Sequence, residues 1–478
     1  MTAKKKELNE MANEPFAAIE GSDLVFGRSA SANKCGFFPV SAILGKGYGG
    51  RRWNTNHSTY TAESVIGSVD YLRELPQKLG LGCYLVTDDH NRRKLDPTNH
   101  YKLAIGGEAK LDGSMGQYMW GWDVPWYLAV WKEGNYLCKA ASLNPIPGVP
   151  CWRIPAGTVA VGHAGVMDRV NDVLCSVIST SEQYRGGNGS ALTSGNASAE
   201  NLSMLGYPAT SMGTSTFEAK AAKRGKGWGA GWYWKETAIA ILMEIILGTT
   251  HIQQAFNANK DSNGLYQGGL GSGVTSMSGW EGYNNYYPVV PYSAGIEMAD
   301  GLGVCNYPIK NSAGSTVYNA PIPVFFGLRN FYGNLWCGKN RIIATKQADK
   351  SYRFFVAKSS LDTWDYTKTS EMLHVGDLAG VETAAWSYIS KINYEGLAGM
   401  PAECAGTSST YYGDGCYRDV ATSGFRSPLG AGDASDVGHA GSVYFYGSDA
   451  PSRARANLSS PLCETSEDFD PVPRVYGN

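Results

Sequence analysis

The tightest grouping of acidic and imidazole side chains in this sequence is Asp88-Asp89-His90, a combination that can transfer protons in catalysis. It continues directly into the charged run 91–94 (NRRK), and such charge-rich turns are usually solvated, so we interpret the cluster as a polar turn. The sequence also lacks the HExxH zinc motif, the phosphate-binding P-loop and the GxSxG nucleophile motif. The glycine-rich run 269–273 has no accompanying lysine and predicts an ordinary loop.

Cysteine thiols are the other candidate reactive groups. No two of the ten cysteines form a CxxC pair, which argues against a zinc site or a redox-active dithiol. We expect most of them to be small buried side chains of a protein in a reducing compartment. They stand at positions 35, 83, 138, 151, 175, 305, 337, 404, 416 and 463.

A different chemistry is indicated by the segment from Tyr411 to Cys463, which uses a restricted set of amino acids. Its 53 residues include no Lys, Gln, Glu, Trp or Met, although these types make up 74 of the first 410 residues. By that composition the segment should contain roughly nine or ten of them. Replacing the adenines of an Asn-type codon (A-A-pyrimidine) gives any of the other amino acids, but never these five and never a stop. The segment therefore has the composition of a stretch rewritten at adenines.

Several motifs in and before this segment resemble the variable proteins of diversity-generating retroelements. In that family, which phages and gut bacteria carry, an adenine-mutagenising reverse transcriptase rewrites the end of a C-type-lectin-like domain. The motifs are the run 401–412 (PAECAGTSSTYY), Asp414, Gly424-Phe-Arg426, Gly430-Ala-Gly432 and Ala440-Gly441, with 326–336 (FGLRNFYGNLW) and 219–228 (AKAAKRGKGW) upstream. The resemblance covers about the last 260 residues and does not extend to the first 200.

The resemblance implies which side chains of the segment form a rigid framework and which contact a ligand. The implied framework positions are Tyr411, Tyr412, Asp414, Gly424, Arg426, Gly432, Ala440 and Gly441. The implied ligand contacts are Cys416, Phe425, Asp433, Ser435, Asp436, His439, Tyr444, Tyr446, Ser448, Asp449, Arg453 and Arg455. Ala434 and Ala456 stand where the family often has bulky residues, and 459–462 (SSPL) replaces its usual Gly and Arg ending. The limits of the diversified block therefore stay open.

Two other chemistries of the C-type-lectin fold lack their motifs here. Formylglycine-generating enzymes need a reactive cysteine pair for copper, and we interpret Cys337 and Cys404 as core residues instead. Sugar-binding lectins use a Glu-Pro-Asn or Gln-Pro-Asp turn and a Trp-Asn-Asp strand, and the C-terminal half contains none of these. We therefore expect no catalytic residues, no metal motif and no cofactor. A structural calcium on loop oxygens stays open, because such sites leave no sequence signature.

The elements that must position the segment are expected upstream of it. Residues 234–247 have apolar side chains at helical spacing and are followed by Gly248, which predicts a buried helix ending in a left-handed glycine. A short basic helix is expected at 217–224. We expect strands at 321–326, 352–356 and 443–446, and a short helix or strand at 381–389. We interpret the acidic residues after Cys463 as a solvated terminus.

The first half of the chain has short apolar runs broken by Gly, Asn, Asp and Pro, which favours strands. One helix is expected at 64–75, stopped by Pro76. The Gly-, Ser- and Asn-rich stretch 185–201 is a candidate boundary.

These expectations combine into an α+β chain. A charged tail (1–21) precedes a mostly β domain for attachment or oligomerisation (22–200), and a C-type-lectin-like variable domain follows (210–478). The net charge of −2 and the pI near 6.4 give no positive surface for nucleic acid or anionic membranes. The N-terminus has no apolar signal, and the longest apolar run, 238–243, is too short to span a bilayer.

We expect a non-enzymatic, hypervariable receptor-binding protein (an adhesin) at a phage tail tip, a virion component for host attachment. Its expected partners are a bacterial surface protein or glycan and other tail proteins, and tail tips by analogy are homo-oligomers, often trimers. An alternative stays open: a bacterial cell-surface or cytoplasmic protein of the same fold, acting as a sensor or as an enzyme related to the formylglycine-generating enzymes.

Overall fold

The computed structural model describes residues 24–29, 34–39, 47–56, 59–181, 183–184, 206–256, 290–310, 314–434, 436–455 and 457–476. Within them the chain is mostly β, with 40% of residues in strands and 14% in helices, and it is largely a β-sandwich. The prediction of a balanced α+β fold is therefore wrong. Only one long stretch of the sequence keeps helical spacing, and most apolar residues occur in short runs that form strands. The predicted tail 1–21, the boundary 185–201 and the run 269–273 lie outside the described residues.

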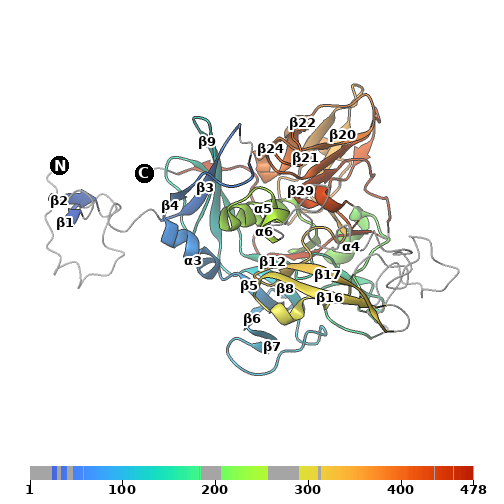
Figure 1. Ribbon diagram of the computed structural model, residues 1–478. Helices are drawn as coiled ribbons and strands as arrows, with labels where there is room; N and C mark the ends of the chain where they lie inside the picture. The colour runs from blue at the N-terminus through green and yellow to red at the C-terminus, as the bar shows by residue number, and fades with distance from the viewer. Residues whose placement is uncertain are drawn as a thin grey trace.

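Four sheets of four or more strands form the bulk of the described chain (Figure 1). The N-terminal six-stranded sheet has the order β32 (Arg474–Val475), β11 (Pro150–Ile154), β9 (Trp126–Glu133), β10 (Tyr136–Ser142), β3 (Gly49–Asn54) and β4 (Ser64–Gly67). The seven-stranded sheet has the order β15 (Trp228–Ala230), β31 (Leu462–Glu464), β12 (Gly157–Ala160), β8 (Gln117–Trp122), β5 (Gly82–Val86), β6 (Arg92–Asp96) and β7 (Asn99–Leu103).

The other two larger sheets come from the C-terminal half. The C-terminal six-stranded sheet, called here the C-terminal sheet, has the order β23 (Ala385–Tyr388), β26 (Gly415–Arg418), β29 (Gly441–Tyr446), β28 (Leu429–Ala431), β19 (Trp336–Gly338) and β30 (Leu458–Ser459). The four-stranded sheet has the order β22 (Leu373–Leu378), β21 (Tyr352–Val356), β20 (Ile342–Lys346) and β27 (Phe425–Arg426).

Smaller sheets complete the strand pairing. They are β1 (Leu24–Ser29) with β2 (Lys34–Pro39), β13 (Val166–Asp168) with β14 (Val173–Cys175), β24 (Lys391–Asn393) with β25 (Met400–Glu403), and β16 (Leu302–Lys310), β17 (Thr316–Phe325) and β18 (Leu328–Arg329).

The central helix α5 (Tyr233–Leu247) confirms the predicted buried helix. Gly248 ends it with a φ of 75°, a left-handed conformation that favours glycine. The helix is apolar on nearly all sides and almost entirely buried, as expected for a helix that packs against several sheets. Figure 1 shows α5 at the centre of the molecule, between β3 and β9 on one side and β29 on the other. The expected basic helix is α4 (Thr214–Ala222), and a short helix, α6 (Ile252–Phe256), follows α5.

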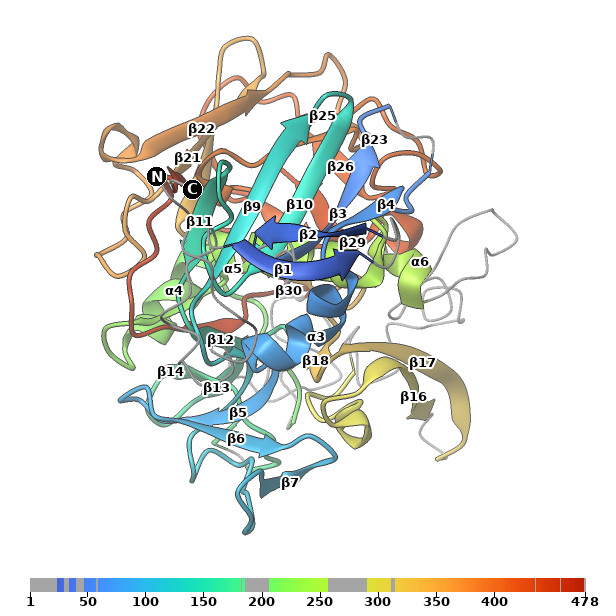
Figure 2. The same ribbon diagram turned by 90° about the vertical axis from the view of Figure 1, so that its left-hand side faces the viewer.

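The N-terminal helix differs from its prediction. Residues 64–67 form β4, and the helix α3 (Val69–Leu79) begins later, where the Ser68 hydroxyl accepts a hydrogen bond from the Tyr71 N–H. Pro76 lies inside the helix, which ends at Gly80 with a φ of 69°. The glycine cap, not the proline, therefore ends α3. Figure 2 shows α3 beside the N-terminal six-stranded sheet.

Strand pairing joins the two halves of the chain. β31, from the C-terminal end, lies between β12 and β15, and β32 pairs with β11 as the edge strand of the N-terminal six-stranded sheet. The interpretation of the residues after Cys463 as a solvated terminus is wrong, because Glu464 is fully buried and the Phe469 ring stacks on Trp234 at 4.7 Å. The division into domains 22–200 and 210–478 stays a prediction, but the two stretches share sheets and one continuous hydrophobic core. No helix among the described residues is long and apolar enough to cross a membrane.

Candidate binding face on the C-terminal sheet

Strand β29 lies in the segment 411–463, called here the restricted segment. Its side chains point alternately to the two faces of the C-terminal sheet. Successive residues of a strand point to opposite faces. Val443 and Phe445 point into the main core, where Phe445 meets Phe354 edge-on with the ring centroids 5.7 Å apart. Tyr444 and Tyr446 belong to a separate cluster on the other face.

Aromatic rings form a row across this other face. The Tyr446 ring stacks on Trp336 of β19 at 4.7 Å and on Tyr417 of β26 at 4.9 Å. Trp386 of β23 lies opposite Tyr417 in the strand register, with the two ring centroids 5.3 Å apart. The imidazole of His439 stacks on Trp386 at 4.9 Å. We call these five residues and Tyr444 the aromatic face.

The aromatic face is open to solvent at some rings and closed at others. Trp386 is 38% exposed, and Tyr417, Tyr446 and His439 are half-buried. Tyr444 is 1% exposed and lies beneath them. Large aromatic groups that are rigidly held and partly exposed are typical of protein-binding and ligand-binding surfaces.

Charged groups border the Trp336 end of the aromatic face. Both carboxylate oxygens of Asp449 accept hydrogen bonds from Arg455, at 2.6 and 2.8 Å. The Arg455 guanidinium lies 5.5 Å from the centre of the Trp336 ring, within range of a cation–π interaction. This bidentate pair gives the border a directional donor and acceptor fixed in position.

Two buried carboxylates support the face from below. Asp436 accepts a hydrogen bond from the Trp336 indole N–H at 2.6 Å and from the Asp433 backbone N–H at 2.8 Å. Asn457 donates from its amide to the Asp433 carboxylate. Burial and the neighbouring charge of Asp433 raise the pKa of Asp436 to about 7. The indole of Trp336 is thereby held in one orientation.

The implied ligand contacts separate into two groups. His439, Tyr444 and Tyr446 belong to the aromatic face, and Asp433, Asp436, Asp449 and Arg455 support or border it. Ser448 is half-buried and hydrogen-bonds Tyr446 of the face. Three others do not join it: Cys416 is buried on the core side, Phe425 lies on β27 against the ring of Tyr366, and Arg453 is exposed. Ser435 lies outside the described residues.

The implied framework positions carry backbone and core contacts. Asp414 is fully buried and accepts a hydrogen bond from the Val443 backbone N–H at 2.9 Å. A Cβ at Gly441 would come within 2.1 Å of the Asp414 carboxylate, so only glycine fits there. Tyr412 is buried, and Arg426 donates to Asp419 at 2.9 Å.

Sequence reasoning did not select Trp336, Trp386 or Tyr417 as contacts. The first two lie outside the restricted segment, and Trp336 was named only as the last residue of the upstream motif 326–336. Tyr417 lies inside the segment, directly after Cys416, which was selected. The alternation of aromatic and small residues in 385–388 (AWSY) was the available signal for Trp386, because it has the period of a strand with one outward face.

The structure also brings together a thiol pair that sequence reasoning missed. Cys404 was interpreted as a lone core residue, but its thiol lies beside that of Cys416, and their hydrogen bond lowers the pKa of Cys404. The Arg418 charge acts in the same direction. Cys404 is half-buried.

Two groups of three side chains among the described residues could hold a metal ion by geometry. They are Cys83, His100 and Asp300, and His163, Glu236 and Cys337, with the ligand atoms of each group within 4.8 Å of one another. Each group has a buried cation close by: Arg329 acts electrostatically on Cys83, and Lys339 on Glu236. A fixed positive charge next to the ligands opposes a divalent cation. Neither group therefore enters the proposal below.

No protein-family model matches the chain, and no curated protein matches it either. Its resemblance to the variable proteins of diversity-generating retroelements stays a prediction from the motifs of the sequence.

Proposed function

We propose that this chain is a non-enzymatic receptor-binding protein that contacts a bacterial surface protein or glycan through the aromatic face. By the resemblance, it acts at a phage tail tip as part of the virion. One observation carries the proposal: Tyr446 and His439 of the restricted segment stack on Trp336 and Trp386, which lie outside that segment, and Tyr417 joins the two stacks by contacting Tyr446 and Trp386.

The physical basis is a separation between scaffold and contact surface. The core side of β29 is fixed by Val443 and Phe445, while the other side presents Tyr446 to partly accessible space. Substitutions at exposed positions usually change stability by less than about 0.5 kcal/mol, so this side can accept many side chains. Aromatic rings supply contact area at a small cost in conformational entropy.

The test compares three single variants for binding of the purified, fluorescently labelled full chain to a panel of bacterial cells. Tyr446→Ala should abolish binding to the recognised cells and shift the melting temperature only slightly. Tyr444→Ala removes a ring that is 1% exposed, so it should cost about 3 kcal/mol of stability. Tyr101→Ala, at an exposed tyrosine of β7, is the matched control and should bind like the wild type. Unchanged binding by Tyr446→Ala and by a Tyr417→Ala, Trp386→Ala double variant would remove the aromatic face from the proposal.

A second candidate function is favoured by the Cys404–Cys416 pair. An enzyme related to the formylglycine-generating enzymes would use paired thiols with copper, and these two thiols are neighbours. Elemental analysis of the purified chain separates the two functions. Stoichiometric copper that is lost in Cys404→Ser would favour the enzyme, and its absence with intact cell binding would favour the adhesin.

A further inference from the structure

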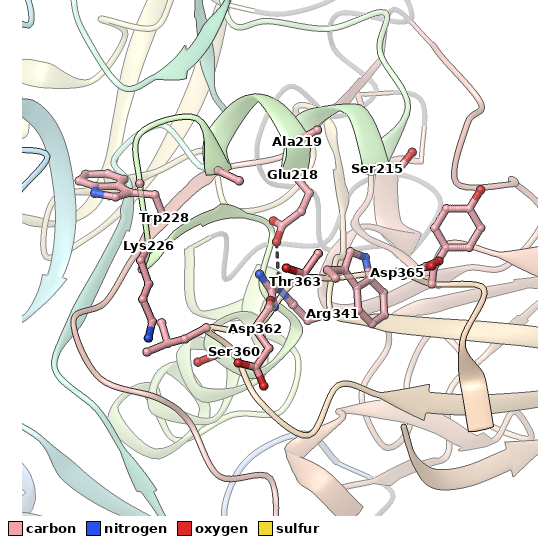
Figure 3. A pocket seen from close by; sticks show the side chains of 16 residues that line it. Ser215, Glu218, Ala219, Lys226, Trp228, Arg341, Ser360, Asp362, Thr363 and Asp365 are labelled. Carbon is pink, nitrogen blue, oxygen red and sulfur yellow. Dashed lines mark hydrogen bonds and ion pairs between the residues drawn. The ribbon is translucent and has the colours of Figure 1, made fainter. Parts of the chain in front are cut away.

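A cavity of about 510 Å³ lies away from the aromatic face, between helix α4, the turn 225–228 that follows it, and the loop 360–366 (Figure 3). Its volume falls within the range of small-molecule sites. None of its lining residues comes from the segment 411–463. The segment reaches the cavity only indirectly, where Phe425 packs on the wall residue Tyr366.

The floor of this cavity is rigid and electrically balanced. Arg341 donates from Nε to Glu218 at 2.9 Å and from Nη1 to the backbone carbonyl of Asp362. The other Glu218 oxygen accepts from the Ala230 backbone N–H at 2.6 Å. Figure 3 shows the Glu218–Arg341 pair in the middle of the pocket. Both side chains are buried, so the pair fixes the shape of the floor without adding net charge.

The walls carry polar groups that are not used within the described fold. The Lys226 ammonium and the Asp362 carboxylate are exposed, and neither has a side-chain partner among the described residues. Thr363 adds a hydroxyl, and the half-buried Trp364 adds an indole. The cavity thus offers a donor, an acceptor and an aromatic surface together.

A second cavity, of about 260 Å³, shares Asp362, Thr363, Trp364 and Asp365 with the first. The loop 362–365 is therefore a wall common to two adjoining sites. An extended ligand made of repeating units fits this arrangement better than a single compact one.

The mixture of charges selects the ligand class. Across the two cavities Lys226, Lys358 and Lys368 are balanced by Asp362, Asp365 and Glu371, so the walls do not favour a phosphate, a sulfate or another anion. Sugar hydroxyls both donate and accept hydrogen bonds, which suits neighbouring carboxylate and ammonium groups. The apolar C–H face of a pyranose ring can pack on an indole. We propose that these cavities bind an uncharged oligosaccharide, with Trp364 stacking on a ring and with Asp362 and Lys226 bonding its hydroxyls.

This site goes beyond the proposed function because it would recognise the same ligand in every copy of the protein. The residues of the aromatic face, in contrast, would differ between copies whose segment has been rewritten. A constant sugar contact would hold the protein on the cell surface and raise the local concentration for the variable contact.

The experiment applies the full-length chain to an array of neutral tri- to hexasaccharides and their sialylated and phosphorylated counterparts. We expect retention of neutral glycans, and Trp364→Ala should weaken it about tenfold, or roughly 1.4 kcal/mol. Asp362→Asn, at an exposed position, should also weaken it and keeps the test valid if Trp364→Ala does not fold. Tyr101→Ala, at an exposed tyrosine of β7, is the control and should leave glycan retention unchanged.

Three results would overturn the inference: no neutral glycan retained, a preference for charged glycans, or retention that both pocket variants leave unchanged. Loss of glycan retention in Trp386→Ala alone would place the sugar on the aromatic face instead. Loss of cell binding in Tyr446→Ala with glycan retention intact separates the two sites.

Discussion

Asp436 shows how single residues hold the aromatic face in place. Its carboxylate lies against the Trp336 indole and near Asp433, and it is almost fully buried. Burial and the charge of Asp433 raise its pKa from the ordinary value of 3.8 to about 7. The folded protein therefore keeps a proton that the unfolded chain releases above about pH 4. Because the folded state then binds more protons, the stability contributed by this group falls as the pH rises from about 4 to about 7.

The variant Asp436→Asn tests this pH dependence. An asparagine side chain still offers an acceptor to Trp336 but cannot ionise. Between pH 4.5 and pH 7.5, the unfolding free energy of the wild type should fall by about 2 kcal/mol relative to that of this variant. This is less than the full pKa shift of Asp436 implies, because the carboxyl group is not completely shielded from solvent. Urea denaturation at both pH values measures the difference, with Asp70→Asn on the exposed surface of α3 as control. An equal wild-type-to-variant difference at both pH values would contradict the prediction.

The motifs of the resemblance implied part of the candidate site. Asp414 and Gly441 are placed as framework residues should be, because a buried carboxylate and a glycine at a close approach are visible in a motif. Cys416 and Tyr417 show what a motif leaves undetermined. The two are neighbours on β26, and one points to the core while the other points to the aromatic face. A shift of one residue along a strand moves a side chain to the opposite face of the sheet. A motif taken from a family resemblance does not determine which residues of the strand point outward.

Elements with local signals were the ones the sequence predicted well. The spacing of apolar residues and Gly248 define α5 within the helix itself. β31 carries no comparable signal, because its two neighbours, β12 and β15, are distant in the sequence. Glu464 looked like a residue of an acidic tail, yet it accepts hydrogen bonds from Arg92 at 2.7 and 3.0 Å and from Thr158 at 2.9 Å. His90, the acid–histidine candidate of the sequence, contacts the same carboxylate at 2.9 Å.

Removal of β31 should therefore prevent folding. A chain truncated before Leu462 loses an inner strand of the seven-stranded sheet, next to its edge strand β15, and leaves the Arg92 guanidinium without its carboxylate, a loss of about 3–5 kcal/mol for the ion pair alone. We expect no cooperative thermal transition for this truncation. Truncation after Pro473 removes only residues beyond it, including the edge strand β32, and should retain the transition. A melting temperature within about 3 °C of the full chain for the chain truncated before Leu462 would show that β31 is dispensable.

At the scale of the molecule, the described chain carries two candidate contact surfaces of different origin. The aromatic face combines side chains of the restricted segment with two tryptophans from outside it, and the cavity beside α4 uses none of that segment. The fold class was mispredicted because the sheets join strands from both halves, and such pairings leave only weak local patterns. Composition alone identified the restricted segment, because the set of amino acids that it uses is a property of the sequence and not of the fold.

The structure predicts where substitutions accumulate in copies of this gene from related genomes. Side chains on the aromatic face can change without loss of core contacts, whereas Val443 and Phe445 pack into the main core. Within 411–463 we expect adenine-directed changes to concentrate at outward positions such as Tyr417, His439 and Tyr446, and to spare these core positions. Alignment of the gene copies measures this directly. Changes spread evenly along the chain, or falling on Val443 and Phe445 as often as on Tyr446, would contradict both the rewriting of the segment and its role as a changeable binding surface.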